Sequence, residues 1–270
     1  MDDLPEISER GVLYPRRLPH RFQRIPAAGS VSELVEWWWI AEWAMPPGAT
    51  SRQELLAFPG CNLVIEPDMV GFSGPATRAS HRDLVGSGWV VAALLRPAAM
   101  PAFTSDPTSL RDSYVPLSAP ELHSQVAEAV AARDIDDAVA RLSAWVTSRV
   151  SIVSDEARLA NSLAEVAGTD SSVVSVGDLA SALKVSMRTV HRLAEQYIGL
   201  TPHTLIRRRR LQEAAEHIRA DPSVSLSTVA AAHGFSDQAH FAREFQRFLG
   251  QTPREYQGRF RTTDNNARGQ

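Results

Sequence analysis

Cysteine and lysine are almost absent from this 270-residue sequence, and a long hydrophobic run is absent altogether. The single cysteine, Cys61, excludes an intramolecular disulfide framework and any zinc or iron–sulfur site that needs several cysteines. A chain so poor in cysteine suits a reducing compartment. Lys184 is the one lysine among 28 basic residues, a compositional bias, so the abundance of arginine alone says little about function.

The longest apolar run is "WVVAALL" at 89–95, and it ends at Arg96 and Pro97. A membrane-spanning helix needs about 20 apolar residues, so this run is far too short. The first ten residues, MDDLPEISER, are acidic and lack the apolar centre of a signal peptide. We therefore expect a soluble, cytoplasmic protein that has no membrane partner.

Charge is unevenly distributed along the chain. The net charge is −3, but residues 151–270 alone carry +2 and residues 1–150 carry −5. With 44% hydrophobic residues the chain is long enough to form two domains. The whole molecule is no polycation, so any binding to nucleic acid must depend on a local basic face.

The pattern along the chain predicts an α+β protein with four segments. Residues 1–118 are rich in Pro and Gly and contain short apolar runs at 54–58, 62–66 and 89–95, which is typical of a β-rich domain. Apolar residues then recur at helical spacing, which predicts a helical linker at 119–154 with a turn near Arg133 and Asp134. From Asp155 the sequence is helical, which predicts an all-α domain at 155–262, followed by a flexible tail at 263–270.

The helical region contains an internal repeat. The segment "VGDLASALKVS" (176–186) aligns with "LSTVAAAHGFS" (226–236), and "GLTP" (199–202) aligns with "GQTP" (250–253). Each repeat is predicted to form a short helix, a tight turn and a second helix. Ser186 would cap the second helix of the first repeat, and Ser236 or Asp237 that of the second. This is the helix-turn-helix pattern, present twice.

Both second helices are amphipathic. In the second repeat, Phe241, Phe245, Phe248 and Leu249 share the face predicted to be buried, whereas Arg243 lies on the opposite face. In the first repeat, Val190, Leu193, Ala194 and Tyr197 form the apolar face, and Arg188 and Arg192 oppose it.

An arginine on an exposed helix face is usually only solvated. Here Arg192 and Arg243 occupy equivalent positions of two repeats, on helices of the kind that enter the DNA major groove, where arginine can bind guanine through two hydrogen bonds. Residues 201–220 join the repeats and would form a helix of roughly 28 Å, long enough to hold two such helices about one DNA turn apart. Four consecutive arginines at 207–210 cannot share one helix face, so some should meet phosphates or acidic partners and at least one should form an internal ion pair.

These residues carry a resemblance to a known family. Residues 158–262 resemble the DNA-binding domain of the AraC/XylS family of bacterial transcription regulators, most densely in "VAAAHGFSDQAHFAREFQRFLGQTPREY" and in "RRRRLQEAAEHI". The resemblance implies that the chain binds double-stranded DNA through two adjacent major-groove segments. It implies base contacts for Arg188, Arg192, Gln238 and Arg243. Contacts to phosphates or base edges are predicted for Ser186, His191, Ser236, His240, Gln246, Arg247, Arg207 and Arg208.

The first half offers weaker signals. The segment from "FPGCNLVIEP" to "WVVAALLRPAAMPAF" is similar to an uncharacterised β-rich domain found before AraC-type domains, which implies a regulatory or dimerisation role. The tryptophans at 37–39 could stack a ligand, but an aromatic core is the simpler interpretation. Histidines 20 and 81 with Glu54 or Glu66 show no metal-ligand spacing, and no basic neighbour activates Cys61, so a packed thiol is expected.

Two functional hypotheses remain. The first is a sequence-specific transcription regulator whose N-terminal domain senses an effector or mediates self-association. The second is an enzyme fused to a DNA-binding module, such as a repair methyltransferase, which the single cysteine disfavours. We expect no enzymatic activity, no cofactor and no metal. A small-molecule effector, a second copy of the chain and RNA polymerase are left open as further partners.

Overall fold

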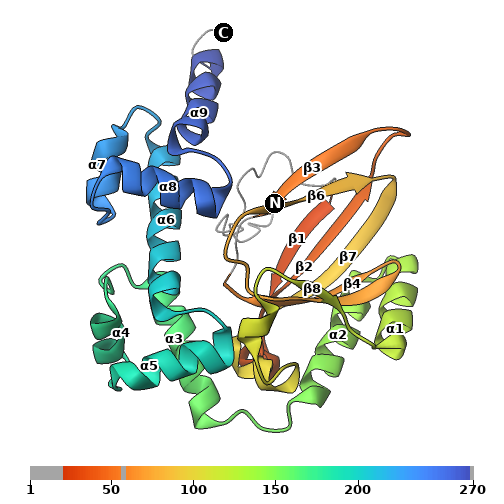
Figure 1. Cartoon of the computed structure of the whole chain (residues 1–270). Helices are drawn as coiled ribbons and strands as arrows, with labels where there is room; N and C mark the ends of the chain where they lie inside the picture. The colour runs from red at the N-terminus through yellow and green to blue at the C-terminus, as the bar shows by residue number, and fades with distance from the viewer. Residues whose placement is uncertain (1–20, 56–58, 268–270) are drawn as a thin grey trace.

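The computed structural model describes residues 21–55 and 59–267, which form a β-rich unit beside an all-helical unit (Figure 1). The expected α+β class and the β-rich first half are confirmed. The β-rich unit contains the strands β1 (Arg21–Pro26), β2 (Val35–Ala44), β3 (Thr50–Leu55), β4 (Cys61–Glu66), β5 (Met69–Ser73), β6 (Ser80–Val85), β7 (Ser87–Leu95) and β8 (Tyr114–Pro116), and the 3-10 helices η2 (Gly29–Glu33), η3 (Pro97–Ala102) and η4 (Pro107–Leu110).

The strands form two antiparallel sheets. Six of them pair in the order β1-β2-β7-β4-β5-β8, and β3 pairs with β6 as a separate ribbon. The runs at 62–66 and 89–95 lie in β4 and β7, as predicted, because both strands are central and buried. The run at 54–58 starts in β3, but residues 56–58 lie outside the described part of the chain.

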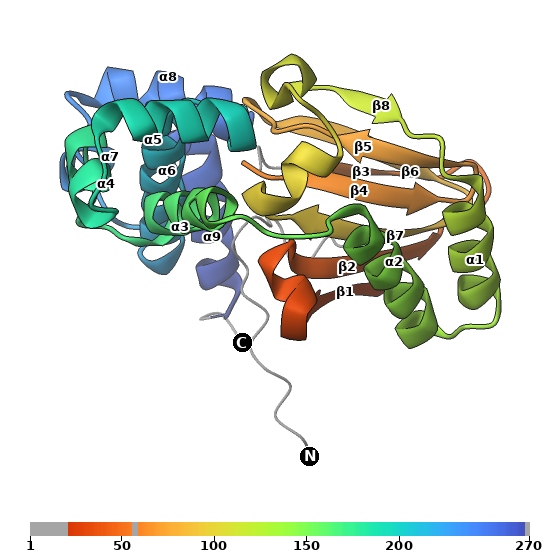
Figure 2. The same cartoon turned by 90° about the horizontal axis from the view of Figure 1, so that it is seen from below.

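A helical hairpin covers one face of the larger sheet (Figure 2). It consists of α1 (Pro120–Ala131) and α2 (Ile135–Arg149), and it turns where predicted, with Arg133 at φ +59° and Asp134 capping α2. Its buried residues Leu122 and Leu142 belong to the same core as residues of the sheet such as Leu63. The helical spacing of residues 119–154 was therefore predicted correctly. We propose that the hairpin is part of the β-rich unit rather than a linker, because its apolar face completes that unit's core.

The helical unit follows. Its elements are α3 (Asp155–Thr169), α4 (Val176–Ala182), α5 (Met187–Leu193), the π-helical turn η5 (Ala194–Ile198), α6 (Pro202–Ala220), α7 (Leu226–Ala232), α8 (Gln238–Leu249) and α9 (Pro253–Ala267). The tail expected from residue 263 begins inside α9, and residues 268–270 lie outside the described residues.

The helix α6 joins two separate hydrophobic cores. Leu205 and Ile206 pack into the core formed with α3, α4 and α5. Leu211 and Ile218 pack into the core formed with α7, α8 and α9. The break between the two cores falls within the four arginines at 207–210, so α6 holds two small units at a fixed separation and rotation.

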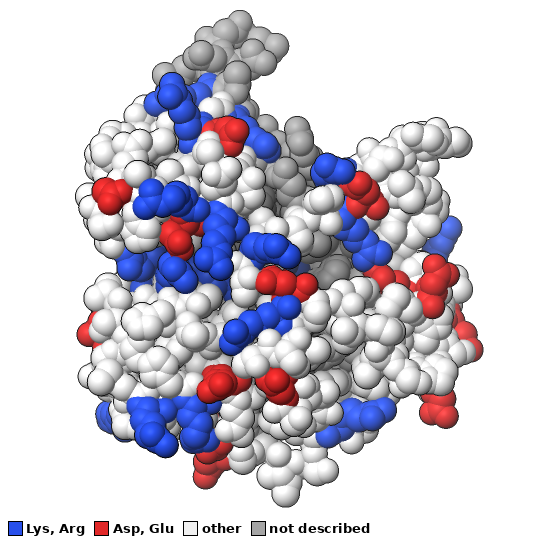
Figure 3. Space-filling view, viewed as in Figure 1, with Lys and Arg blue, Asp and Glu red and all other residues white. Residues whose placement is uncertain are grey.

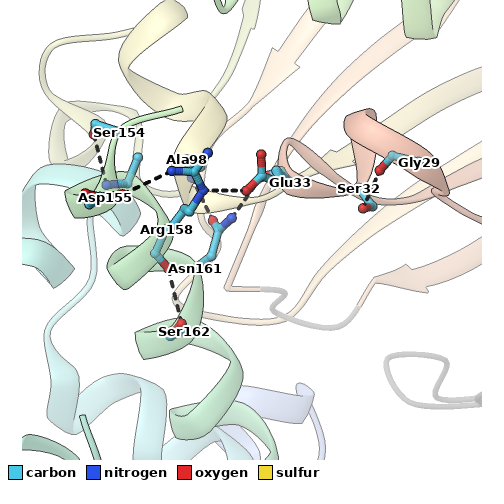
Figure 4. Close-up of polar contacts among 10 residues, drawn as sticks. Gly29, Ser32, Glu33, Ala98, Ser154, Asp155, Arg158, Asn161 and Ser162 are labelled. Atoms are coloured by element: carbon cyan, nitrogen blue, oxygen red, sulfur yellow. Dashed lines mark hydrogen bonds and ion pairs between the residues drawn. The ribbon is translucent and has the colours of Figure 1, made fainter. Parts of the chain in front are cut away.

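Polar contacts tie α3 to the β-rich unit (Figure 4). The guanidinium of Arg158 pairs with Glu33 of η2 at 2.7 Å and with Asp155 at 3.1 Å. The side chain of Asn161 donates to the Glu33 carbonyl and accepts from the Ala98 N–H of η3. A second contact lies at the other end of the interface, where the Arg111 guanidinium donates to the Gly199 carbonyl. The two units therefore meet at more than one point.

No helix in residues 21–55 and 59–267 is long and apolar enough to cross a membrane.

Candidate nucleic-acid interface

The two predicted repeats have the same backbone construction. The first helices, α4 and α7, have seven residues each and start after the capping serines Ser175 and Ser225. The tight turns place Lys184 and Gly234 in the left-handed region, at φ +56° and +68°. The repeat therefore extends from sequence to structure, and both units are helix-turn-helix units.

The ends of the repeats also match. Gly199 and Gly250 end the second helices at φ +76° and +77°. Thr201 and Thr252 then accept a backbone N–H from the residue three positions on, and so begin α6 and α9. One difference is local: the second helix of the first unit ends in the π-helical turn η5, whereas α8 is regular throughout.

The predicted apolar faces are buried. In α8, Phe241 and Phe245 are fully buried and their rings meet edge to face at 5.3 Å. In α5 and η5, Val190, Leu193 and Tyr197 are buried in the first core. Each second helix is thus fixed by its apolar side, and its opposite face is free to bind a partner.

The exposed face of α8 carries two of the four predicted base-contact residues. Gln238 is the first residue of the helix and Arg243 lies near its middle, and both are exposed. Asp237, not Ser236, caps α8, because its carboxylate accepts the His240 N–H at 2.6 Å. The Ser236 hydroxyl bonds instead to the His240 ring Nδ1 at 3.1 Å.

The other two predicted base-contact residues, Arg188 and Arg192, are exposed on α5. Arg192 is not free, because its guanidinium pairs with Glu156 of α3 through contacts of 2.8 and 3.0 Å. Gln196 and Tyr197 complete this network, and the ion pair lowers the pKa of the Glu156 carboxyl. DNA contact by Arg192 must therefore compete with, or share, this carboxylate.

The residues predicted to contact phosphates or base edges fall into three groups. Ser186 caps α5 and is exposed there, beside the exposed His191. In the second unit, Ser236, Gln246 and Arg247 are exposed, whereas His240 is half-buried against the Phe235 ring. The third group, Arg207 and Arg208, lies on α6.

The four arginines of α6 point in different directions, as their spacing requires. Arg207 pairs with Glu244 of α8 at 3.0 Å. Arg209 pairs with Glu213 at 2.8 Å and is 2% exposed, which confirms the predicted internal ion pair. Arg208 is only 4% exposed, because the β-rich unit and α8 cover it, so its contact with a phosphate stays a prediction that requires another arrangement of the two units.

Both second helices lie on the same side of α6 (Figures 1 and 2). Figure 3 views that side, and Lys and Arg side chains gather over the lower and middle parts of the helical unit. Because the net charge of this region is small, binding to DNA would need a local basic face, and such a face is present.

The candidate residues of the β-rich unit that the structure describes lie in different surroundings. Trp38 is buried in the main core, and Trp39 and Trp43 are partly buried against the other face of the sheet. Glu66 is held by Arg82 and Tyr114, while His81 is exposed. His20 lies outside the described residues, as does the side chain of Glu54. In the part of the chain that the structure describes, no three His, Cys, Asp or Glu side chains are grouped as metal ligands would be.

Cys61 is a packed thiol, as predicted. Its side chain is 2% exposed at the start of β4, and burial raises the pKa of the thiol to about 12. At neutral pH the group is protonated and shielded, which is the opposite of a reactive thiolate.

Two helix-turn-helix units on one connecting helix, each with an exposed polar face, define a DNA-binding domain of the double helix-turn-helix class. Residues 179–259 match the family described as "Helix-turn-helix domain", and residues 23–116 match a domain of unknown function, DUF6597. Residues 179–259 are therefore similar to a helix-turn-helix family, in line with the resemblance given above, and residues 23–116 are similar to a domain family of unknown function.

The relatives are bacterial regulators. The chain is 37% identical over 81 residues to the HTH-type transcriptional activator RhaS of Pectobacterium carotovorum, covering 30% of this chain and 29% of that protein. It is 34% identical over 84 residues to the probable transcriptional regulator LumQ of Photobacterium leiognathi, covering 31% and 34%. The chain spans about a third of the length of these curated relatives.

Among solved structures, the chain is similar to a probable AraC family transcriptional regulator from Rhodopseudomonas palustris. The two are 23% identical, with a TM-score of 0.35, over 38% of this chain and 96% of the other.

The sequence did not reveal three residues that lie on other elements and contact the candidate interface or the helices behind it. Glu156 lies on α3, 36 residues before the arginine that it binds. Thr77 and Arg111 belong to the β-rich unit and reach the α6–α8 interface. No local pattern marks any of the three, because their role depends on how separate elements pack.

Proposed function

We propose that this chain is a sequence-specific DNA-binding transcription regulator. The observation that carries the proposal is the pair of equivalent helix-turn-helix units, whose exposed α5 and α8 faces lie on one side of α6. Arg188, Arg192, Gln238 and Arg243 are the proposed base-contact residues. Ser186, His191, Ser236, His240, Gln246, Arg247 and Arg207 are the proposed contacts to phosphates or base edges.

The length of α6 supports contact with two adjacent major-groove segments. Its 19 residues span roughly 28 Å, close to the ~34 Å pitch of DNA. Buried packing on both sides of α6 keeps the two units in phase. One molecule can therefore read two half-sites on one side of the duplex.

The β-rich unit is proposed to regulate this activity, through an effector or through self-association, rather than to catalyse a reaction. Two of its chemically functional groups are engaged or shielded: Glu66, considered above as a metal ligand, binds Arg82, and the Cys61 thiol is buried. RNA polymerase is a possible further partner in this function. We also propose that the protein acts in the bacterial cytoplasm.

Selection of bound duplexes from a random pool by the full chain tests the proposal. We expect enrichment of one motif with two conserved blocks about 10 base pairs apart. Recovery of a pool without any enriched motif, at a salt concentration where the chain still binds DNA, would contradict sequence-specific regulation.

A further inference from the structure

A cavity of about 190 Å³ lies between the β-rich unit and the helical unit. The β-rich unit contributes Thr77 and Arg111 to its wall, the first turn of α6 contributes Thr201 and Thr204, and α8 contributes Arg247. The volume corresponds to roughly six water molecules, which suits a compact ligand. Because α8 forms part of the wall, a ligand here would contact the second DNA-binding helix directly.

The guanidinium of Arg208 lies in the wall of this cavity without a hydrogen-bond partner. The side chain is 4% exposed, and none of its three nitrogen atoms makes a hydrogen bond within the protein. The guanidinium lies over the Phe248 ring, whose centroid is 5.3 Å from Cζ. Burial lowers the pKa of this arginine to about 9. A buried charge without a partner is strongly unfavourable, and such groups are commonly completed by a bound ion or ligand.

The acidic residues nearby are already engaged. Glu244, the one carboxylate that the described residues contribute to the cavity wall, pairs with Arg207 at 3.0 Å. Asp112 accepts the backbone N–H of Thr77 at 2.6 Å and its hydroxyl at 2.5 Å. Neither carboxylate makes a hydrogen bond to Arg208, and Asp112 acts on the Arg208 charge only through electrostatic attraction, so the hydrogen-bonding groups of the guanidinium stay unsatisfied.

The rest of the wall also favours negative charge. Arg111, Arg207 and Arg247 join Arg208 around the cavity, against the single acid Glu244. The wall includes the N-terminal turn of α6, a 19-residue helix, and the positive end of a helix dipole attracts anions. The hydroxyls of Thr201 and Thr204 add neutral hydrogen-bonding groups.

We propose that this cavity binds a small anionic effector, one that carries carboxylate or phosphate groups and accepts hydrogen bonds from Arg208. The ligand would bridge the β-rich unit, α6 and α8. Arg207 and Arg247 belong both to the cavity wall and to the proposed DNA phosphate contacts, so occupancy is coupled to DNA binding. That regulatory part rests on the proposed function, whereas the binding site itself does not.

Thermal unfolding and calorimetric titration of the full chain without DNA test the site, with inorganic phosphate in one arm and succinate in the other. Sodium chloride keeps ionic strength constant, and uncharged succinamide is the control for succinate. At a hundredfold excess over Kd, we expect the matching anion to raise the unfolding midpoint by roughly 5–10 °C, with one site per chain. The arm that responds identifies the charged group. If neither anion exceeds the sodium chloride control, the proposal is wrong.

The variant Arg208→Met separates a ligand-binding arginine from a structural one. Without anion, we expect its midpoint to equal or exceed that of the wild type, because an unpaired buried charge is replaced by an apolar side chain. Its response to the anion should be lost. A lower midpoint together with an unchanged anion response would show that Arg208 is structural and that the ion binds elsewhere.

The variant Arg111→Gln is a second test of anion binding that does not alter α6. It decides whether the cavity binds the anion if Arg208→Met does not fold. We expect anion affinity to fall at least about tenfold, because one guanidinium of the wall is lost. Arg133→Gln, which removes an exposed arginine in the α1–α2 turn, should keep the full response. Equal losses in Arg111→Gln and Arg133→Gln would indicate nonspecific charge effects and overturn the proposal.

Discussion

Insertion of two alanines between Arg209 and Arg210 is expected to abolish specific DNA binding while both helix-turn-helix units remain folded. The insertion would rotate the second unit by roughly 200° about α6 and move it by about 3 Å. The position separates the two cores: Arg209 donates to the Val173 carbonyl in the first unit, and Arg210 donates to the His233 carbonyl in the second. Each unit therefore keeps its own hydrophobic core, whereas the ion pairs that cross the insertion point, Arg209–Glu213 and Arg207–Glu244, are lost.

Quantitative binding of the full chain to a selected duplex, together with circular dichroism, measures this effect. A matched insertion of two alanines between Arg133 and Asp134 lengthens the exposed α1–α2 turn and should preserve binding. If the α6 insertion binds the same duplex with wild-type affinity, the two units do not act as a fixed pair.

Replacement of Arg243 by alanine is expected to cost about 1–3 kcal/mol on the specific site, a loss of roughly 5- to 150-fold, and to relax preference at one or two base pairs. Arg192→Ala should cost less. Contact between Arg192 and DNA competes with the ion pair to Glu156, whereas Arg243 is exposed on the polar face of α8.

Competition binding at fixed salt, with single-base variants of the selected duplex, gives both the affinity and the base preference. Arg133→Ala is the control for loss of an exposed arginine away from the helix-turn-helix units. A uniform loss across all sequences in Arg243→Ala would make this residue a phosphate contact instead of a base reader.

The repeat made the helical unit predictable from sequence. Helix spacing, the capping residues and the glycines at 199 and 250 are local features, and each has the same role in both copies. The buried faces of α5 and α8 follow from apolar periodicity alone. The sequence also predicted that at least one of the four arginines forms an internal ion pair, because consecutive helix positions point in different directions.

What sequence could not show depends on packing between distant elements. Arg208 has the same sequence context as a solvated arginine, and only the β-rich unit and α8 bury it. The sequence predicts a linker at 119–154, and our proposal that this hairpin belongs to the β-rich unit depends on the surface that its apolar face meets, which amphipathic spacing does not reveal. The partner of Arg192 was hidden for the same reason, since Glu156 lies in a different helix.

Hydroxyl-radical footprinting of the full chain on a duplex with the selected motif tests the central claim most directly. Two helix-turn-helix units fixed by α6 should protect two segments about 10 base pairs apart on one side of the duplex, with one molecule bound. Protection of a single segment, or of two segments on opposite sides of the duplex, would contradict the account.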